Sequence, residues 1–169
     1  MAKTTSIPSH VLPLSKARFN AASALSTTVV LAAIDAEAVD DVGTRIWQKF
    51  VFLTAFSGVT SATRQPIGPL LANIQARALL LDLMREVVSL GRAIGVSLEE
   101  DYAEDSLQFC RTLPSAIASS MHNDLERGTR LELDWLSGWI QEKVASMRVI
   151  TPMDRAIARV LSVYSEGGP

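Results

Sequence analysis

The sequence has a single cysteine, no long apolar run and no cluster of basic residues. Cys110 is the single cysteine, so no internal disulfide can form, and no CxxC pair or neighbouring histidine gives metal-ligand spacing. No apolar run reaches the ~18 residues of a membrane span. The formal net charge is -2, and no Lys/Arg stripe is present, which argues against nucleic acid binding. We expect a cytoplasmic protein with neither a membrane nor a nucleic acid partner.

The glycines lack the patterns that bind phosphate groups. None of the nine forms part of a GxGxxG or GxxxxGK[ST] motif. In both motifs, a glycine-rich turn brings phosphates against the N-terminus of a helix. The sequence therefore encodes no nucleotide cradle of these kinds, and we expect no cofactor to bind to this chain alone.

What is present is typical of one globular domain. The chain has 169 residues, of which 48% are hydrophobic and 20% charged, enough to bury a core. Lys16 and Arg18 precede the largely apolar run 21–33, an arrangement that resembles a secretion signal. Interspersed Ser and Thr residues and the distance of the basic residues from residue 1 argue against that interpretation.

The first 40 residues differ in pattern from the rest. We expect a loose tail over residues 1–15, a helix over 16–33 and a short strand over 34–39. We therefore predict two parts, an N-terminal tail with a remnant helix at 1–33 and a helical domain at 34–169.

From residue 40 onward, apolar residues recur every three or four positions, which predicts helices throughout. Pro and Gly residues at 64–69 predict a turn, and Gly95 and Gly128 are expected at helix ends. A capping box at 97–100 and Pro152 after Thr151 are typical of helix starts. The expected helices begin near residue 40 and then cover 71–94, 97–111, 114–128, 131–147 and 151 onward. The predicted fold class is all-α.

Two charged residues fall on apolar helix stripes. Lys49 follows Ile46 by three residues, and Glu132 precedes Leu136 by four, so both are expected to face the core. Burying an unpaired charge is costly, so such positions either form a buried ion pair, reach water with their long side chains, or serve a site. Periodicity alone favours the first two explanations.

A third polar group, the run 119–124, includes Ser120 and Asp124 on one helix face. Composition favours a solvated surface with a capping role. His122 has no second ligand at metal spacing and is expected on the surface, with no metal site. Cys110 is expected to be an inert buried thiol, and a set of large side chains is expected to fill the core: Met84, Met147, Trp47, Trp135 and Trp139.

Several of these segments together resemble the C-terminal domain of the ketopantoate reductases (2-dehydropantoate 2-reductases). Residues 45–53 (RIWQKFVFL) resemble the family's "LW-x-K-hydrophobic" helix, and 63–68 (TRQPIG) resemble its "TR-x-P-hG" turn. Residues 119–124 (SSMHND) are similar to "SSM-x-x-D", and 129–138 (TRLELDWLSG) to "x-T-E-I-D-x-h-N-G". Thr151-Pro152 matches a late helix start. The resemblance covers roughly 34–165.

The resemblance implies a multi-helix fold like the C-terminal domain of 6-phosphogluconate dehydrogenase, and a role in the NADPH-dependent reduction of ketopantoate to pantoate, in pantothenate and coenzyme A biosynthesis. By resemblance, Lys49 is the catalytic lysine at the substrate carbonyl, and Glu132 holds the substrate hydroxyl and tunes Lys49. Ser120 and Ser57 would contact substrate, and Asp124 would organise the site.

Departures from the family pattern bear on substrate and cofactor. Leu53 and Ser57 stand where family members often carry asparagines, which puts the identity of the keto-acid substrate in doubt. The family's Rossmann domain, with its GxGxxG, has no counterpart here, although residues 16–39 resemble its last helix and strand. NADPH belongs to the intact family, and none is expected on this chain alone.

Three interpretations remain open at this point. The chain is the substrate half of a reductase that works with a separate Rossmann domain in trans, or a non-enzymatic helical module that retains the fold, or an unrelated helical bundle. An exposed apolar face left by the missing half predicts a homo-oligomer.

Overall fold

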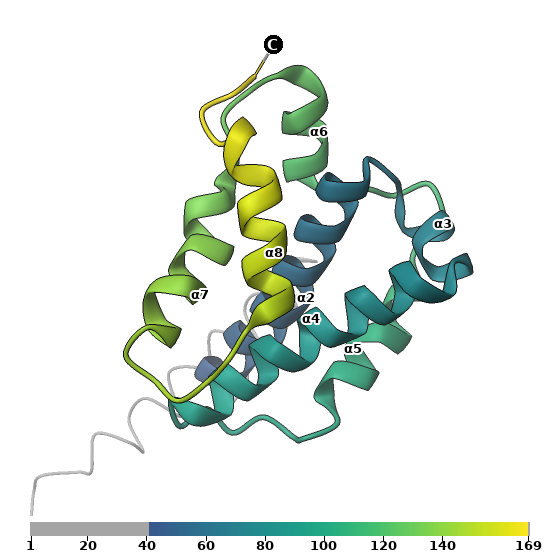
Figure 1. Ribbon diagram of the computed structural model, residues 1–169. Helices are drawn as coiled ribbons and strands as arrows, with labels where there is room; N and C mark the ends of the chain where they lie inside the picture. Colours follow the sequence, from purple (N-terminus) through teal and green to yellow (C-terminus); the bar gives the residue numbers. More distant parts are fainter. Residues whose placement is uncertain (1–40, 169) are drawn as a thin grey trace, which may run out of the picture. The chain divides into compact units, whose positions relative to one another are not determined.

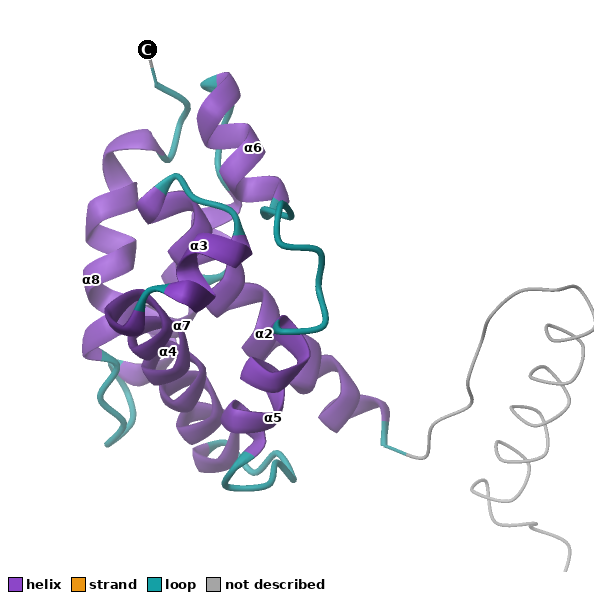
Figure 2. Cartoon of the chain, turned by 90° about the vertical axis from the view of Figure 1, so that its right-hand side faces the viewer, coloured by secondary structure: helices purple, strands orange, loops and turns teal. Residues whose placement is uncertain are grey.

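The computed structural model describes residues 41–168, and this part of the chain consists of helices and loops without a strand (Figures 1 and 2). The all-α prediction is confirmed. The expected helix at 16–33, the strand at 34–39 and the boundary after residue 33 lie outside the described residues. The elements are α2 (Val42–Thr63), α3 (Ile67–Ala72), α4 (Ile74–Ala93), α5 (Tyr102–Cys110), α6 (Ser120–Arg127), η1 (Glu132–Trp135), α7 (Ser137–Val144), α8 (Pro152–Leu161) and η2 (Ser162–Tyr164).

The core lies between the two long helices α2 and α4, with α8, α5 and α6 packed around them (Figure 1). On α2 the buried stretch begins only at Val51 and runs to Ser61. The turns before Val51 project past the neighbouring helices (Figure 2), and their apolar Val42 and Ile46 are 56% and 62% exposed. Half of the α2 stripe therefore faces outward.

Glycine and asparagine set several helix ends. Gly95 and Gly128 have φ of 92° and 67°, left-handed values that a side chain strains, so their predicted positions after α4 and α6 are confirmed. The helix expected at 71–94 is in fact two helices. Asn73 has extended backbone, and its side chain accepts hydrogen bonds from the N–H groups of Gln75 and Ala76, which starts α4 anew.

Three predicted starts and lengths are wrong. The capping box at 97–100 starts no helix, since α5 begins at Tyr102 after Asp101. The segment 114–118 is a loop, and α6 begins only at Ser120. The single helix expected at 131–147 is divided into η1 and α7 at Leu136, whose φ and ψ are -100° and -94°.

The loop before α6 is bound by the N-terminus of α3. The N–H groups of Ile67 and Gly68 donate to the carbonyls of Ile117 and Ser115, each over 2.9 Å. A Cβ on Gly68 would lie 2.8 Å from the Ser115 carbonyl oxygen, so the approach requires glycine. The α3 N–H groups, otherwise without helical partners, thus position the loop that leads into α6.

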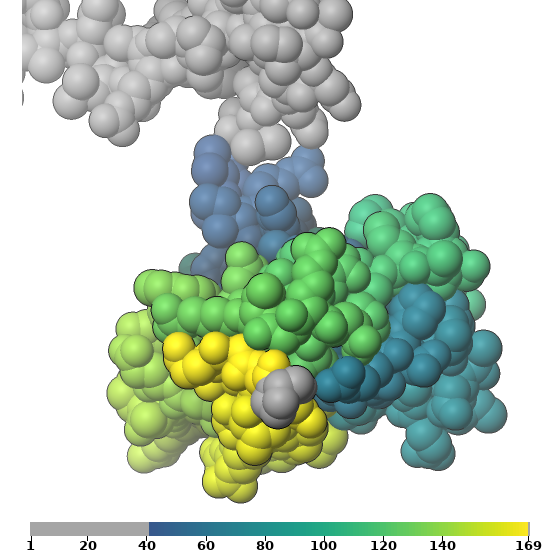
Figure 3. All heavy atoms as spheres, turned by 90° about the horizontal axis from the view of Figure 1, so that it is seen from above, coloured from purple at the N-terminus to yellow at the C-terminus, as the bar shows by residue number. Residues whose placement is uncertain are grey.

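The C-terminal end closes against the segment after α6. The N–H of Leu131 donates to the carbonyl of Ser165 over 3.0 Å, and Gly167 lies against the backbone of Gly128. Figure 3 shows these last described residues, in yellow, beside the green residues that follow α6. This contact fixes the entry to η1.

Candidate functional site

Lys49 does not face the core. It lies on the projecting part of α2, two residues before the buried stretch begins, and its side chain is exposed. The prediction of a core-facing lysine is wrong because Lys49 lies before the buried stretch of α2, and Ile46, three residues earlier on the same apolar stripe, is 62% exposed. The neighbouring Phe50 and Phe52 are partly buried against the core, so this part of the helix is only partly covered.

Glu132 is also exposed, and its predicted position on a core-facing stripe is wrong as well. It begins the 3₁₀ helix η1, where its neighbours Leu131 and Leu133 are both buried at 4% exposure. The α-helical period used to place it does not apply there. No hydrogen bond or ion pair joins Lys49 to Glu132 within residues 41–168, so the buried-pair explanation is wrong too.

A buried polar junction ties α2 to α6. The hydroxyl oxygens of Thr60 and Ser119 lie 2.9 Å apart, and Ser119 accepts the N–H of His122 over 3.0 Å as the N-cap of α6. Thr60 donates to the Phe56 carbonyl at 2.7 Å, so Ser119 must be the donor to Thr60. His122, expected on the surface, is half-buried. Its Nδ1 lies 2.9 Å from the Thr60 carbonyl and must carry the proton, because a carbonyl oxygen only accepts.

The other predicted substrate contacts lie around this junction. Ser57 is buried at 4% exposure one turn before Thr60, and its carbonyl is 3.4 Å from the Thr60 hydroxyl. Ser120 is exposed as the first residue of α6. Asp124, one turn on, accepts a hydrogen bond from Thr129 at 3.2 Å and is half-buried. The expected capping role in this run belongs to Ser119.

These residues form a line along α2 and not one compact cluster. Lys49 precedes Thr60 by eleven residues, or roughly 16 Å of helix at 1.5 Å per residue. Lys49, Leu53 and Thr60 fall on one side of α2, since their spacing is close to whole helical turns. The structure therefore brings Ser57 and Ser119 to Thr60, and leaves Ser120 exposed beside Ser119. Lys49 lies about three turns away, near the projecting end of the same side.

A second polar network, which the sequence did not predict, joins α4 to α8. The carboxylate of Glu86 accepts the backbone N–H groups of Met153 and Asp154, over 2.8 and 2.9 Å. Asp154 is fully buried and accepts a hydrogen bond from Gln141 over 2.7 Å. Burial raises the pKa of Asp154, and burial, with the nearby Asp154 and Asp82 charges, raises the pKa of Glu86. The sequence feature that could have indicated this network is Glu86, a carboxylate between the apolar residues Met84 and Val87 of α4.

Aromatic side chains gather at the projecting end of α2. Trp47, Phe50 and Trp139 meet edge to face, with ring centroids 5.3–5.9 Å apart. They border an apolar groove of about 320 Å³ together with Ile46, Ile94 and Trp135. Trp135, expected in the core, is 76% exposed, so that prediction is wrong. Met84 is fully buried as expected, and so is Cys110. Burial raises the pKa of the Cys110 thiol to about 11, which favours the unreactive protonated form.

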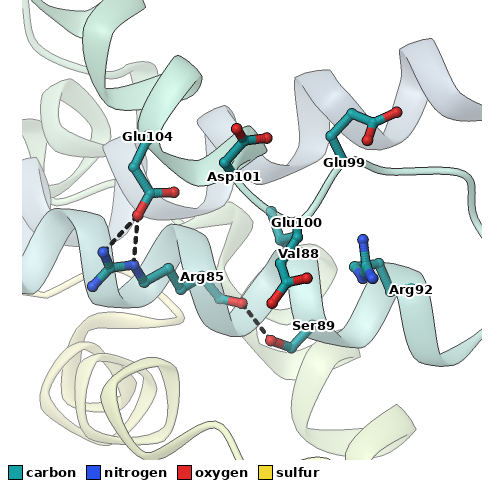
Figure 4. Close-up of a pocket in the computed structure, with 8 residues that line it drawn as sticks. All are labelled: Arg85, Val88, Ser89, Arg92, Glu99, Glu100, Asp101 and Glu104. Atoms are coloured by element: carbon teal, nitrogen blue, oxygen red, sulfur yellow. Dashed lines mark hydrogen bonds and ion pairs between the residues drawn. The ribbon is translucent and has the colours of Figure 1, made fainter.

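A larger polar groove, of about 830 Å³, lies between α4 and the start of α5 (Figure 4). Arg85 pairs with Glu104 there, and its carbonyl accepts the Ser89 hydroxyl. The remaining charges are one cation, Arg92, and three carboxylates: Glu99, Glu100 and Asp101. This excess of negative charge disfavours an organic acid, and none of the predicted site residues lines the groove.

The segment that carries these residues matches a known protein family. Residues 41–165 match the family described as the ketopantoate reductase PanE/ApbA C-terminal domain. The chain belongs to the ketopantoate reductase family. This match covers every predicted site residue.

Relatives agree with that assignment. An uncharacterized oxidoreductase of Bacillus subtilis, YkpB, is 29% identical over 119 residues, which is 70% of this chain and 39% of that protein. A 2-dehydropantoate 2-reductase of Caulobacter vibrioides is 28% identical over 130 residues, covering 76% of this chain and 44% of that one. The chain thus spans less than half the length of these curated relatives.

Solved structures share the fold. A ketopantoate reductase from Ralstonia eutropha superposes with a TM-score of 0.75 at 27% identity, over 85% of this chain and 48% of that one. A D-mandelate dehydrogenase, bound to NADH and anilino(oxo)acetate, gives 0.75 at 18% identity, over 86% of this chain and 61% of that one. At that lower identity the likeness shows the fold alone.

The described residues do not fit a dinucleotide or a metal ion. A dinucleotide cradle of the family's kind needs a strand, a glycine-rich turn and a helix, and residues 41–168 contain no strand. In the same range, no group of three or more His, Cys, Asp or Glu side chains lies close enough to hold a metal. None of the described helices is long and apolar enough to span a membrane.

Proposed function

We propose that this chain supplies the substrate-binding half of an NADPH-dependent 2-oxo acid reductase of the 2-dehydropantoate 2-reductase type. The observation that carries the proposal is Lys49: it is exposed on the projecting turns of α2, within the segment that the family match covers. An exposed ammonium on the same side of α2 as Thr60 is placed to meet a ligand.

The chemistry assigned to this chain is binding and charge stabilisation. The Lys49 ammonium would hydrogen-bond the carbonyl oxygen of the oxo acid and stabilise the negative charge that develops on it. Ser57 and Ser120, near the N-terminus of α6, would bind polar groups at the other end of the substrate. Glu132 and Asp124 would hold a hydroxyl and orient the site. The cofactor has to be held by a dinucleotide-binding domain outside residues 41–168.

The exposed apolar groove at Ile46, Ile94 and Trp135 supports a partner at this end of the molecule. Monomeric proteins rarely leave such a patch uncovered. We propose that a Rossmann domain, supplied in trans, covers it, and that the uncovered chain self-associates in the cytoplasm. A ketopantoate reductase of Staphylococcus aureus with the same fold is described as dimeric (20% identity, TM-score 0.73, over 84% of this chain and 51% of that one).

Mixing the purified chain with a separately produced Rossmann domain of a relative tests this function. We expect oxo acid-dependent NADPH oxidation only in the mixture, and none from the chain alone. Turnover by the chain alone would contradict the proposed division of labour. No turnover in a mixture that forms a complex would favour the second candidate, a non-enzymatic helical module, for which the apolar groove is the supporting observation.

A further inference from the structure

Helices α7 and α8 lie side by side (Figure 1) and border a groove of about 440 Å³, a volume within the range of small-molecule sites. None of the residues proposed to bind the oxo acid lines this α7–α8 groove. From α7 and its C-terminal end the lining includes Gln141, Val144 and Ala145, and from α8 it includes Arg155, Ala158 and Arg159. The groove is therefore a cavity separate from the proposed substrate site.

The rim of the α7–α8 groove is positively charged. Arg155 and Arg159 are exposed and four positions apart in α8, so they lie on the same face of the helix and repel each other. Neither forms an ion pair with another residue in the range 41–168. The helix dipole favours Arg159 in the last turn of α8, but it disfavours Arg155 near the N-terminus. The stability of α8 therefore does not explain Arg155.

The Arg155 side chain is held in place by a buried network. Its Nε donates to the Gln141 side-chain carbonyl over 3.3 Å. The Gln141 amide nitrogen in turn donates to the Thr151 hydroxyl over 3.0 Å and to the Asp154 carboxylate over 2.7 Å, and both of these partners are fully buried. The terminal N–H groups of Arg155 have no hydrogen-bond partner among the described residues. The guanidinium group is thus oriented in advance, with two donors open to a ligand.

The floor of the groove is apolar and made of small side chains. Val144 is buried, Ala158 is half-buried and Ala145 is exposed, so an apolar group placed there would be covered by three aliphatic side chains. No carboxylate lines the groove against its two arginines. Two guanidinium groups match a doubly charged anion better than a single carboxylate, and phosphate is the common anion of that kind.

We propose that the α7–α8 groove binds an organic phosphate with a short apolar group. The phosphate would lie between Arg155 and Arg159, which can donate paired hydrogen bonds to its oxygens. The apolar group would lie against Val144, Ala145 and Ala158. This ligand is distinct from the oxo acid, so the inference goes beyond the proposed function and does not depend on it.

Calorimetry on the full chain with butyl phosphate and inorganic phosphate tests the inference, because the two share the anion and differ in the apolar group. We expect butyl phosphate to bind about tenfold more tightly. Arg159→Met, at an exposed position, should weaken both at least tenfold. Ala145→Leu, which fills the floor, should remove the advantage of butyl phosphate and leave inorganic phosphate unchanged. Arg148→Met, at an exposed arginine that does not line the groove, is the matched control and should change neither affinity.

The outcomes also separate this site from the proposed substrate site. Equal affinity of wild type and Arg159→Met for butyl phosphate would overturn the inference, and so would failure of butyl phosphate to bind at millimolar concentration. Equal affinity of wild type for the two phosphates would exclude the apolar floor as part of the site and would overturn it as well. Lys49→Met should leave both affinities unchanged. A loss of affinity in that variant would move the phosphate to the substrate site and contradict the inference, while leaving the proposed function intact.

Discussion

The carboxylate of Glu86 accepts the backbone N–H of Asp154, with 2.9 Å between Oε2 and nitrogen. Glu86 thereby caps α8 from another helix, sixty-eight positions away in sequence. The side chain of Thr151, the N-cap residue, makes no capping hydrogen bond. The Glu86 carboxylate instead accepts the free backbone N–H groups at the start of α8. Negative charge at a helix N-terminus is favourable, which explains why a half-buried glutamate is tolerated between α4 and α8.

Replacing Glu86 should loosen this junction. Glu86→Ala removes the acceptor of two backbone N–H groups, and we expect a loss of about 2 kcal/mol in the free energy of unfolding. Chemical denaturation monitored by circular dichroism measures it. Glu99→Ala, at an exposed carboxylate, should change stability little; an equal loss in both variants would show that Glu86 has no special role.

The stability should depend on pH through Asp154. Burial raises the pKa of the Asp154 carboxyl in the folded protein, so between its unfolded and folded pKa the folded state binds more protons. Its contribution is therefore greatest below the unfolded value and is lost as the pH rises through the folded value. Asp154→Asn should become more stable relative to wild type as the pH rises from 4 toward 7, measured by denaturation across that range. A relative stability that does not vary with pH would contradict this.

Neighbouring serines at the start of α6 should behave differently. Ser119→Ala removes the cap to His122 and the bond to Thr60, and should lower stability by about 1 kcal/mol or more. Ser120→Ala, at the next and exposed position, should leave the melting temperature unchanged. Similar melting temperatures for the two variants would mean that the junction between α2 and α6 does not stabilise the fold.

The contact between α3 and the loop before α6 should not tolerate a side chain at Gly68. Gly68→Ala would place a methyl group 2.8 Å from the Ser115 carbonyl oxygen and should cost roughly 1–3 kcal/mol. Gly138→Ala is a matched control, because its nearest neighbour is 3.5 Å away. Thermal unfolding of both variants measures the difference. Equal stability of the two variants would show that the loop at Ser115 shifts to accommodate the methyl group at no cost.

The fold class could be predicted because helical periodicity and terminal glycines depend on local sequence. Gly95 and Gly128 end helices where their φ values require glycine. Helix starts were less predictable, since the competing partners are distant. Residues 114–118 form a loop because their carbonyls pair with α3, and the start of α8 depends on Glu86.

The site was predicted less well for a related reason. An apolar stripe indicates a covered face but not whether the cover belongs to the same domain, so Lys49 was placed in the core although it is exposed. The predicted core-facing orientation of Glu132 is wrong because Glu132 lies in η1, a 3₁₀ helix to which the α-helical period does not apply. The junction of Thr60, Ser119 and His122 joins residues about sixty positions apart, and no local pattern indicates such a pairing.

Reconstituted turnover by a Lys49 variant tests the central claim most directly. Lys49 is exposed, so Lys49→Met should fold with wild-type stability and still bind a supplied Rossmann domain. We predict that it lowers oxo acid-dependent NADPH oxidation at least a hundredfold, whereas Arg148→Met, at an exposed cation elsewhere, retains wild-type turnover. Full activity of the Lys49→Met complex would contradict the account.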